Sequence, residues 1–422
     1  MMIYLDNNAT TRVAPEVVEA MLPFLTDGYF NPSSLYAPAE EVHRHVEEAR
    51  ASIARAIGAL PSEVLFTSCA SESNNTALFG AVQAGGLNSR GEPRRHIITT
   101  AVEHPAVLEV VRRLRTLGYD VTELPVNRAG QLDPADFVRA LRPDETLIVS
   151  IMHANNETGV IFPVSELARI TKQTDEAIVF HTDATQSMTK LPIDLAGEMK
   201  NVDLLSFSGH KFHAPKGVGA LFIRRGTPLR PFLYGGLQEG GQRAGTENVP
   251  YIIGMAKAVE LAAATHSEDA QRMTALRDRL EKRLVESIPY LEVNGGGAER
   301  MPNTLNVACH AVEGESLLMS LAEAGICASS GSACTSGSLE PSHVLRAMAV
   351  PSTAIHGNLR FSLSRYTTKE EIDTVAEVFP KIVASLRQLS PFWNDHQQRP
   401  DFSSWQSELE KKYAKDQAAP EG

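Results

Sequence analysis

Short apolar runs alternate with helical patterns from residue 40 to residue 250. Each run is rich in β-forming residues and is followed by polar ones, which is typical of βα units on a largely parallel sheet. The predicted strands are residues 64–67, 96–100, 147–152, 178–182, 204–208 and 218–223. We therefore expect an α/β domain with a mostly parallel sheet.

An amphipathic helix is predicted over residues 40–57. Its apolar positions recur every three or four residues and so share one helical face. They are Val42, Val46, Ala49, Ile53 and Ala56. Gly58 is well placed to end this helix, because glycine readily adopts the left-handed conformation that follows many helices.

The pattern changes after a glycine-rich segment at residues 235–245, which is either a mobile loop or a segment approached closely by another backbone or a ligand. A second helix is predicted by an apolar stripe formed by Met273, Leu276, Leu280, Leu284 and Ile288. Strands are predicted at 302–308 and 359–363, so these elements indicate a smaller α+β domain. Beyond Pro391 the tail is polar, and we expect a surface-lying or disordered extension.

Composition argues against several classes of protein, such as nucleic-acid-binding, membrane-spanning and disulfide-rich proteins. The 422 residues include 40 basic and 51 acidic side chains, and the formal net charge of −11 argues against nucleic acid as the main partner. The amino terminus lacks a signal-peptide pattern, and no window approaches the roughly 20 apolar residues of a membrane-spanning helix. Four cysteines without a C-x-x-C pair exclude a disulfide framework and a four-thiolate zinc site. We expect a cytoplasmic protein in a reducing compartment, with no membrane partner.

A lysine with candidate chemistry follows the predicted strand 204–208. That strand ends in Ser208, Gly209, His210 and Lys211, and α/β sheets bind ligands at the carboxyl ends of parallel strands. Partial desolvation at such a place lowers the pKa of a lysine below its usual value of about 10.4, and the free amine can form a Schiff base with a carbonyl. The alternative interpretation is a surface lysine beside a turn.

Asp183 follows the predicted strand 178–182 in the motif HTDATQ. An ionised carboxylate at a buried strand end is costly unless it meets a cation. The protonated ring nitrogen of pyridoxal phosphate is such a cation, and Gln186 is within reach of a ring hydroxyl. The alternative is that Asp183 caps a helix, because D-x-x-Q loosely fits a capping box.

Polar segments also follow other predicted strands. SCASESNN opens a helix, whose N-terminus favours an anion, so Ala70 and Ser71 are candidates for binding phosphate. A serine near a helix start is nevertheless common without any ligand. His104 and the pair Asn155 and Asn156 follow two further strands. A lone histidine is more often structural than catalytic, but these strand ends are expected to converge on one crevice.

Cys334 lies in the segment 327–343, which is rich in serine and threonine. Such a segment has little to bury, so we expect Cys334 on an exposed, mobile loop, where a thiol can act as a nucleophile. The other cysteines lie in apolar or strand-like contexts and are interpreted as packing residues. They are Cys69, Cys309 and Cys327. Arg360 leads an apolar strand and can offer a bidentate fork to a substrate carboxylate or form a structural ion pair.

These motifs together resemble the pyridoxal-phosphate-dependent cysteine desulfurases of the NifS/IscS type. The resemblance covers about residues 3–393. Its motifs are YLDNNATT, YFNPSSL, EHPAV, NNETG, HTDATQ, SGHKFHAPKG, QRAGTEN, SSGSACTSGS, EPSHVLRAM and RFSLSRYTT. GSACTSGSLEPSH and LRQLSPFW look most like the nitrogen-fixation branch, NifS.

The resemblance implies a fold-type I transferase, which is a homodimer with active sites near the subunit interface. A large domain binding pyridoxal phosphate would span residues 16–255. A small α+β domain carrying the catalytic-cysteine loop would comprise residues 1–15 and 256–391, and the tail would be 392–422.

The resemblance also implies catalytic roles by position. Lys211 would hold the cofactor as a Schiff base, and His104 would stack on the ring and take part in proton transfer. Asp183 would pair with the ring nitrogen, and Gln186 would contact the ring hydroxyl. Cys334 would be the nucleophile.

Further residues are implied to bind the phosphate and the substrate. Those around the phosphate would be Ala70, Ser71, Ser208 and His210. Thr246 would reach the phosphate from the partner subunit. Asn156 would lie against the cofactor and, with Arg360, hold the substrate carboxylate.

The implied reaction converts L-cysteine into L-alanine and leaves a persulfide on Cys334 that supplies iron–sulfur cluster assembly, here of nitrogenase clusters. The acceptor would be an iron–sulfur scaffold or another protein, and Cys334 would touch iron transiently through its persulfide. The alternatives are a selenocysteine lyase or another fold-type I enzyme such as an aminotransferase. From a different class, a sulfur carrier or cluster scaffold without catalysis is the alternative.

Two positions depart from the family pattern. Cys327 stands where relatives usually carry alanine, seven residues before Cys334. We hypothesise that Cys327 can form an internal disulfide with Cys334 or receive its sulfane sulfur. Ser71 replaces a common threonine and keeps the hydroxyl.

Overall fold

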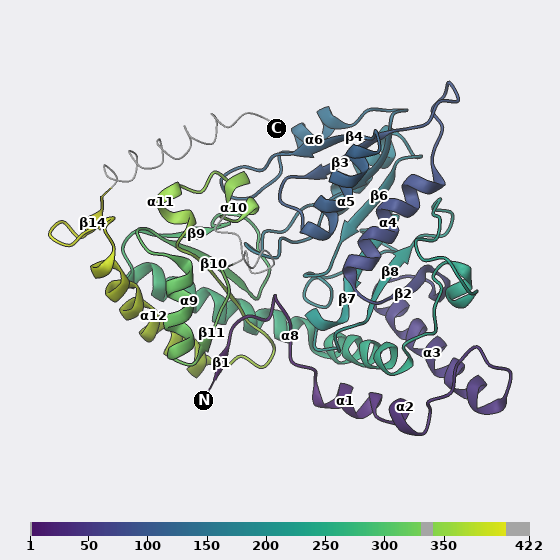
Figure 1. The fold of residues 1–422 in the computed structure, drawn as a ribbon, viewed down its shortest axis with the longest axis horizontal. Helices are drawn as coiled ribbons and strands as arrows, with labels where there is room; N and C mark the ends of the chain where they lie inside the picture. Colours follow the sequence, from purple (N-terminus) through teal and green to yellow (C-terminus); the bar gives the residue numbers. More distant parts are fainter. Residues whose placement is uncertain (1, 331–340, 402–422) are drawn as a thin grey trace.

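A seven-stranded sheet forms the centre of the larger part of the molecule in the computed structural model, which describes residues 2–330 and 341–401 (Figure 1). The strand order is β2-β8-β7-β6-β5-β3-β4. Strand β8 runs antiparallel to β2 and β7, and the other pairings are parallel. The strands are β2 (Val64–Thr67), β3 (His96–Thr100), β4 (Asp120–Leu124), β5 (Thr146–Ser150), β6 (Val179–Asp183), β7 (Leu204–Ser208) and β8 (Gly219–Ile223).

The predicted strands of this sheet are confirmed, with bounds that shift by at most two residues. Strand β4 was not predicted. It lies at the edge of the sheet, and Leu124 is its buried residue, so its sequence DVTEL carries no continuous apolar run.

Helices cover both faces of the sheet, because the central strands are apolar on both sides. Ile97 and Leu204 point into one core, while their neighbours Ile98 and Leu205 point into the other. Helices α4 (Ala70–Ala84) and α5 (Pro105–Thr116) cover the first face. The second face is covered by α3 (Ala37–Ala56), α6 (Pro134–Ala140), α7 (Val164–Thr174) and the first part of α8 (Val249–Ser287).

Helix α3 confirms the helix predicted at residues 40–57. Val42, Val46, Ala49 and Ile53 are buried in it as expected. The expectation for Ala56 is wrong: the helix ends at this exposed residue, and the next residue, Ile57, is buried instead. Gly58 then adopts a φ of 69° and donates its N–H to the Arg55 carbonyl, which ends the helix as predicted.

A second core surrounds a three-stranded antiparallel sheet of order β12-β10-β9. The strands are β9 (Leu291–Asn294), β10 (Thr304–Cys309) and β12 (Asn358–Ser362), which confirms the two strands predicted here to within two residues. The N-terminal strand β1 (Ile3–Tyr4) pairs in parallel with β11 (Ile326–Cys327). The helices of this part are α9 (Gly314–Glu323), α10 (His343–Ala347), α11 (Ser352–Ile355) and α12 (Lys369–Leu389).

Helix α8 joins the two cores. Its N-terminal half contributes Val259 to the core of the larger sheet, and its C-terminal half contributes Leu276 to the second core. The predicted apolar stripe from Met273 to Ile288 is buried along it and just past its end. The predicted domain boundary at 255 and 256 falls inside this helix. The division into domains stays a prediction.

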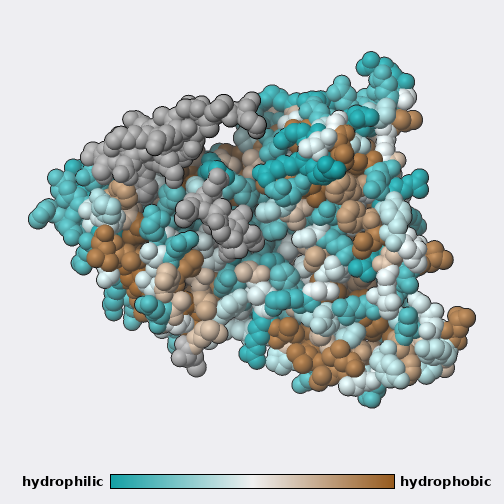
Figure 2. Space-filling model, viewed as in Figure 1, coloured by the Kyte–Doolittle hydropathy of each residue, from teal (hydrophilic) through white to brown (hydrophobic). Residues whose placement is uncertain are grey.

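Four of the remaining short elements, two helices and two strands, lie at the margins of the molecule. Helices α1 (Pro15–Met21) and α2 (Pro23–Thr26) form one corner, and Figure 2 shows apolar side chains gathered there. Strands β13 (Trp393–Asn394) and β14 (Arg399–Pro400) form a hairpin at the start of the predicted tail. Single-turn 3-10 helices are Pro61–Glu63, Gly209–Lys211 and Gln238–Gly241. None of the helices in the described part of the chain combines enough length and apolar composition to span a lipid bilayer.

Candidate active site

A cavity of about 360 Å³ lies at the carboxyl ends of the central strands and the start of α4. Most of the predicted site residues line it, although they come from six separate segments of the chain. They are Ala70, Ser71, His104, Asn156, Asp183, Gln186, Ser208, His210, Lys211 and Arg360. The prediction that polar strand ends converge on one crevice is confirmed. The individual roles of these residues stay predictions.

Lys211 lies at the end of the 3-10 turn that follows β7. Its Nζ donates hydrogen bonds to the backbone carbonyls of Asn8, at 2.7 Å, and Ala9, at 2.9 Å. The lysine is therefore held at the cavity wall by the N-terminal segment, which is more than two hundred residues away in sequence. Lys211 does lie in a turn, but it is half-buried at the cavity, so the alternative of a surface lysine is wrong.

Asp183 ends β6 with its carboxylate buried at the cavity. Asn74 Nδ2 donates to one carboxylate oxygen at 2.7 Å, and the Thr185 N–H donates to the other at 2.9 Å. Residues 185–190 form turns and no helix, so the helix-cap alternative for Asp183 is wrong. The carboxylate is thus oriented by neutral donors and remains available to a cation.

His104 caps the N-terminus of α5 as well as lining the cavity. Its Nδ1 accepts the Ala106 N–H at 3.0 Å, so the proton of the neutral imidazole is on Nε2. Burial lowers the pKa of His104; the Asp183 carboxylate opposes this shift and the positive charge of Lys211 adds to it. The ring is therefore held as a neutral imidazole with a fixed orientation.

Helix α4 offers an anion site at one end of the cavity. The first N–H groups of a helix, here those of Ala70 and Ser71, lack intrahelical acceptors. Cys69 occupies the N-cap position, but its side chain accepts no hydrogen bond from them. Gly219 of β8 allows this turn to approach closely, because a Cβ there would lie 2.9 Å from Cys69 Cα. Cys69 itself lines the cavity, which corrects its interpretation as a packing residue.

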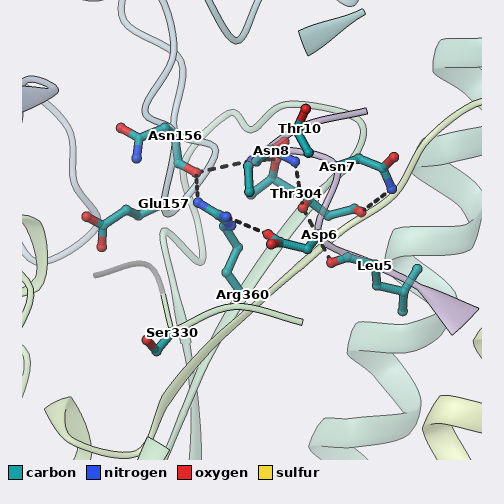
Figure 3. Close-up of polar contacts among 12 residues, drawn as sticks. Leu5, Asp6, Asn7, Asn8, Thr10, Asn156, Glu157, Thr304, Ser330 and Arg360 are labelled. Atoms are coloured by element: carbon teal, nitrogen blue, oxygen red, sulfur yellow. Dashed lines mark hydrogen bonds and ion pairs between the residues drawn. The ribbon is translucent and has the colours of Figure 1, made fainter. Parts of the chain in front are cut away.

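Arg360 reaches the cavity from β12 and is 4% exposed (Figure 3). Its Nη1 donates to the Asn156 carbonyl at 2.9 Å, and its Nη2 donates to Asp6 Oδ1 at 2.8 Å. Its Nε is buried and has no hydrogen-bond partner among the described residues. The two interpretations of Arg360 are therefore compatible: it forms an ion pair and still presents a donor at the cavity.

Two buried ionisable groups lie behind the cavity wall. Lys190 Nζ donates to the backbone carbonyls of Gln186 and Lys211, both at 3.0 Å, and burial lowers its pKa to about 7. The Glu103 carboxylate accepts from Thr100 Oγ1 and the Met152 N–H, and burial raises its pKa to about 8. Neither group was predicted, because a buried lysine or glutamate leaves no local sequence signal.

Some predicted residues lie elsewhere. Thr246 is exposed and does not line this cavity, and Asn155 closes a turn by accepting the N–H groups of Glu157 and Thr158. Cys334 lies outside the described residues. Cys309 is buried, as expected for a packing residue, and burial raises its pKa to about 12. Cys327 is half-buried in β11 and forms no disulfide with another cysteine of the described residues. Its hypothesised exchange with Cys334 stays a prediction.

Other cavity residues were missed by the sequence reasoning. Asn74 lies four residues after Ala70 and therefore on the same face of α4, a spacing that could have identified it. Asn8 and Ala9 belong to the motif YLDNNATT, but nothing in that motif indicates which strand it meets. Within residues 2–330 and 341–401, no cluster of three or more histidine, cysteine or acidic side chains could hold a metal ion.

The chain is similar to known proteins over most of its length. The family model described as aminotransferase class-V matches residues 3–375. A cysteine desulfurase of Trichormus azollae is 53% identical over 394 residues, covering 93% of this chain and 96% of the relative. Cysteine desulfurase NifS of Azotobacter vinelandii is 51% identical over 394 residues, which cover 93% of this chain and 95% of that relative. The solved structure of a NifS-like protein has a TM-score of 0.84 at 39% identity and covers 92% of this chain and all of its own.

Proposed function

Because this chain belongs to the aminotransferase class-V family, among its pyridoxal-phosphate-dependent cysteine desulfurases, we propose that it removes sulfur from L-cysteine at the cavity described above. The products would be L-alanine and a persulfide on Cys334. The observation that carries the proposal is the meeting of Lys211, Asp183 and Arg360 on one cavity. A reactive amine, a buried carboxylate and a carboxylate-binding fork are what this chemistry needs.

The residues at one end of the cavity fit pyridoxal phosphate, the cofactor of this family. Asp183 offers its carboxylate to a ring nitrogen, and the buried Gln186 Oε1, unpaired among the described residues, can accept from a ring hydroxyl. The start of α4 would receive the phosphate, with Ser208 and His210 at its side. When bound, the cofactor withdraws electrons from the substrate and makes its Cα proton removable.

The protein's own groups would move the protons. Lys211 Nζ, held by the Asn8 and Ala9 carbonyls, would take the proton from the substrate Cα. His104, neutral because of its burial, would stack on the ring and assist the transfer through Nε2. Asn156 and Arg360 would hold the substrate carboxylate at the opposite end of the cavity.

Cys334 would carry out the sulfur transfer. Its thiolate would attack the substrate sulfur, so that a sulfur–sulfur bond forms as the bond from Cβ to sulfur breaks. The electron pair of the broken bond goes to Cβ, which takes up the proton released by the Cys334 thiol, and Lys211 would return its proton to Cα to give alanine. On either side of the undescribed residues, Asn358 donates to the Ser330 carbonyl and Ser342 donates to Glu157, whose neighbour Asn156 lines the cavity. A reducing, cytoplasmic compartment would keep this thiol available.

The proposal includes a homodimer. Large apolar side chains are exposed in residues 22–36 and 233–237, including Leu35, Leu237 and Tyr234. Such a cluster is typical of a protein interface. Thr246 follows the second of these segments and is exposed, which suits a residue that reaches the partner's phosphate site.

The persulfide would pass to an iron–sulfur scaffold or another sulfur-acceptor protein, with Cys334 touching iron transiently through it. We place the enzyme in the nitrogen-fixation branch on the likeness of GSACTSGSLEPSH to that branch. A sulfur-transfer assay with a nitrogen-fixation scaffold and a general scaffold, compared under equal conditions, tests this finer assignment.

Incubation with L-cysteine tests the main proposal. The wild type should release equimolar alanine and sulfide in the presence of a reductant, and without it mass spectrometry should find about 32 Da added to the peptide containing Cys334. Cys334→Ala should lose this activity, whereas the matched variant Cys327→Ala should keep it. Absence of alanine from the wild type would refute the proposal and favour a carrier, whereas full activity of Cys334→Ala would refute the assignment of Cys334 as the nucleophile.

A further inference from the structure

The N-terminal segment of residues 6–9 contacts two residues of the cavity wall. Asp6 pairs with Arg360 (Figure 3), and the carbonyls of Asn8 and Ala9 accept from Lys211. Its backbone is fixed beside β12, because the Asn7 N–H donates to the Ser362 carbonyl and the Ser362 N–H donates to the Leu5 carbonyl. This pairing places Asp6 next to the strand that carries Arg360. Asn8 then continues to the Lys211 end, where its carbonyl accepts from Lys211 Nζ.

We propose that Asp6 is a positioning residue that sets the orientation of the Arg360 guanidinium for the substrate carboxylate. The Asp6 carboxylate and the Asn156 carbonyl hold the two Nη nitrogens at 2.8 and 2.9 Å. These contacts leave Nε–H, which is buried and unpaired within the described part of the chain, to bind an acceptor in the cavity. The inference rests on the proposed function, since it assigns the carboxylate of L-cysteine to Arg360.

Charge supports the same assignment. Arg360 is 4% exposed, and a buried guanidinium without a counter-ion is strongly unfavourable. The other acid nearby, Glu157, is buried, and this burial raises its pKa. Asp6, whose side chain is 21% exposed, pairs with Arg360 at 2.8 Å and is its counter-ion among the described residues.

Asp6 has a second effect that opposes the first, because its negative charge repels an incoming carboxylate. Two variants separate the effects. Asp6→Ala removes both the charge and the hydrogen-bond acceptor, whereas Asp6→Asn removes the charge and keeps an acceptor oxygen. If orientation is the main contribution, the asparagine variant should behave much like the wild type.

The test is steady-state kinetics of the holoenzyme with L-cysteine. We expect Asp6→Ala to raise KM about tenfold, the loss expected for one charge-assisted hydrogen bond, with kcat changed by less than about twofold. Asp6→Asn should restore KM to within about threefold of the wild type. The visible absorbance of the bound cofactor should be unchanged in both variants, because Asp6 lies at the substrate end.

A second measurement isolates the carboxylate. The competitive inhibition constant of L-alanine should rise in Asp6→Ala, but that of L-alaninamide, which keeps the amine and lacks the carboxylate, should not. Asp175→Ala is the matched control. Asp175 forms an ion pair of 2.6 Å with Arg94, which is buried to a similar degree but lies at the amino ends of the strands of the large sheet, away from the cavity. This variant should lower the melting temperature and leave KM unchanged.

An unchanged or lowered KM in Asp6→Ala would overturn the inference. A rise of KM in Asp6→Asn as large as that in Asp6→Ala would also overturn it. So would an equal rise in the inhibition constants of L-alanine and L-alaninamide in Asp6→Ala. These outcomes differ from failure of the proposed function, in which the wild type itself would produce no alanine from L-cysteine.

Discussion

The two ends of the cavity are built in different ways. At the cofactor end, Asp183 is the last residue of β6, Lys211 ends the turn after β7, and Ala70 opens the helix after β2. At the substrate end, Arg360 meets Asp6 across 354 positions of sequence and the Asn156 carbonyl across 204. The cofactor end therefore depends on one rigid sheet, whereas the substrate end depends on how β12 and the N-terminal segment pack against that sheet.

This difference implies that variants should separate by the kinetic parameter they change. Loss of a group at the cofactor end should reduce kcat, because that group acts on the reacting atoms. Loss of a group at the substrate end should raise KM, because that group holds a part of the substrate that does not change during the reaction.

The largest effect is expected for Lys211→Ala. Removal of the group that would both hold the cofactor and move the Cα proton should lower the rate of alanine formation by about a thousandfold or more. Lys216→Ala, an exposed lysine five residues later, is the control and should react at the wild-type rate. A Lys211→Ala enzyme that retained its kcat would show that the cofactor end has been assigned wrongly.

A smaller effect is expected for Arg360→Lys. A lysine keeps the positive charge but lacks the planar guanidinium that binds the Asp6 carboxylate, the Asn156 carbonyl and a substrate carboxylate at the same time. KM for L-cysteine should therefore rise by about tenfold to a hundredfold. We expect kcat to change much less. Steady-state kinetics with L-cysteine should therefore compare the change in KM with the change in kcat. A fall in kcat with unchanged KM would place Arg360 functionally at the cofactor end.

A separate effect, on stability and not on kinetics, is expected at the cofactor end, where Glu103 precedes His104. Burial raises the pKa of Glu103 from its usual value to about 8, so the folded protein binds a proton that the unfolded chain has released. Unfolding free energy should therefore decrease as pH rises from about 4.5 to 8, by at most about 1.4 kcal/mol per pH unit from this group.

Glu103→Gln cannot titrate and should lack this contribution. Urea unfolding at pH 5, 6.5 and 8 should show that the variant becomes more stable relative to the wild type as pH rises. Glu198→Gln, at an exposed position, is the control and should follow the wild type. Parallel curves for Glu103→Gln and the wild type would indicate that Glu103 is charged in the folded protein throughout this range.

Sequence reasoning identified the cofactor end more completely than the substrate end. Lys211, Asp183 and His104 were recognisable because each is a chemically distinctive residue placed just after an apolar run. Glu103 and Lys190 were missed because their unusual properties come from burial, which is a consequence of packing. Strand β4 was missed for a related reason, since an edge strand needs little apolar sequence.

The sequence by itself determined the alternation of strands and helices, the amphipathic faces of α3 and α8, and the residue types available for chemistry. Those features are local, because hydrophobic periodicity and strand-end position are properties of neighbouring residues. Only the tertiary structure decided that Asp6 is the partner of Arg360, that Asn8 and Ala9 hold Lys211, and that Asn74 orients Asp183. Each of these contacts joins residues more than a hundred positions apart, and its geometry is set by the packing of whole elements.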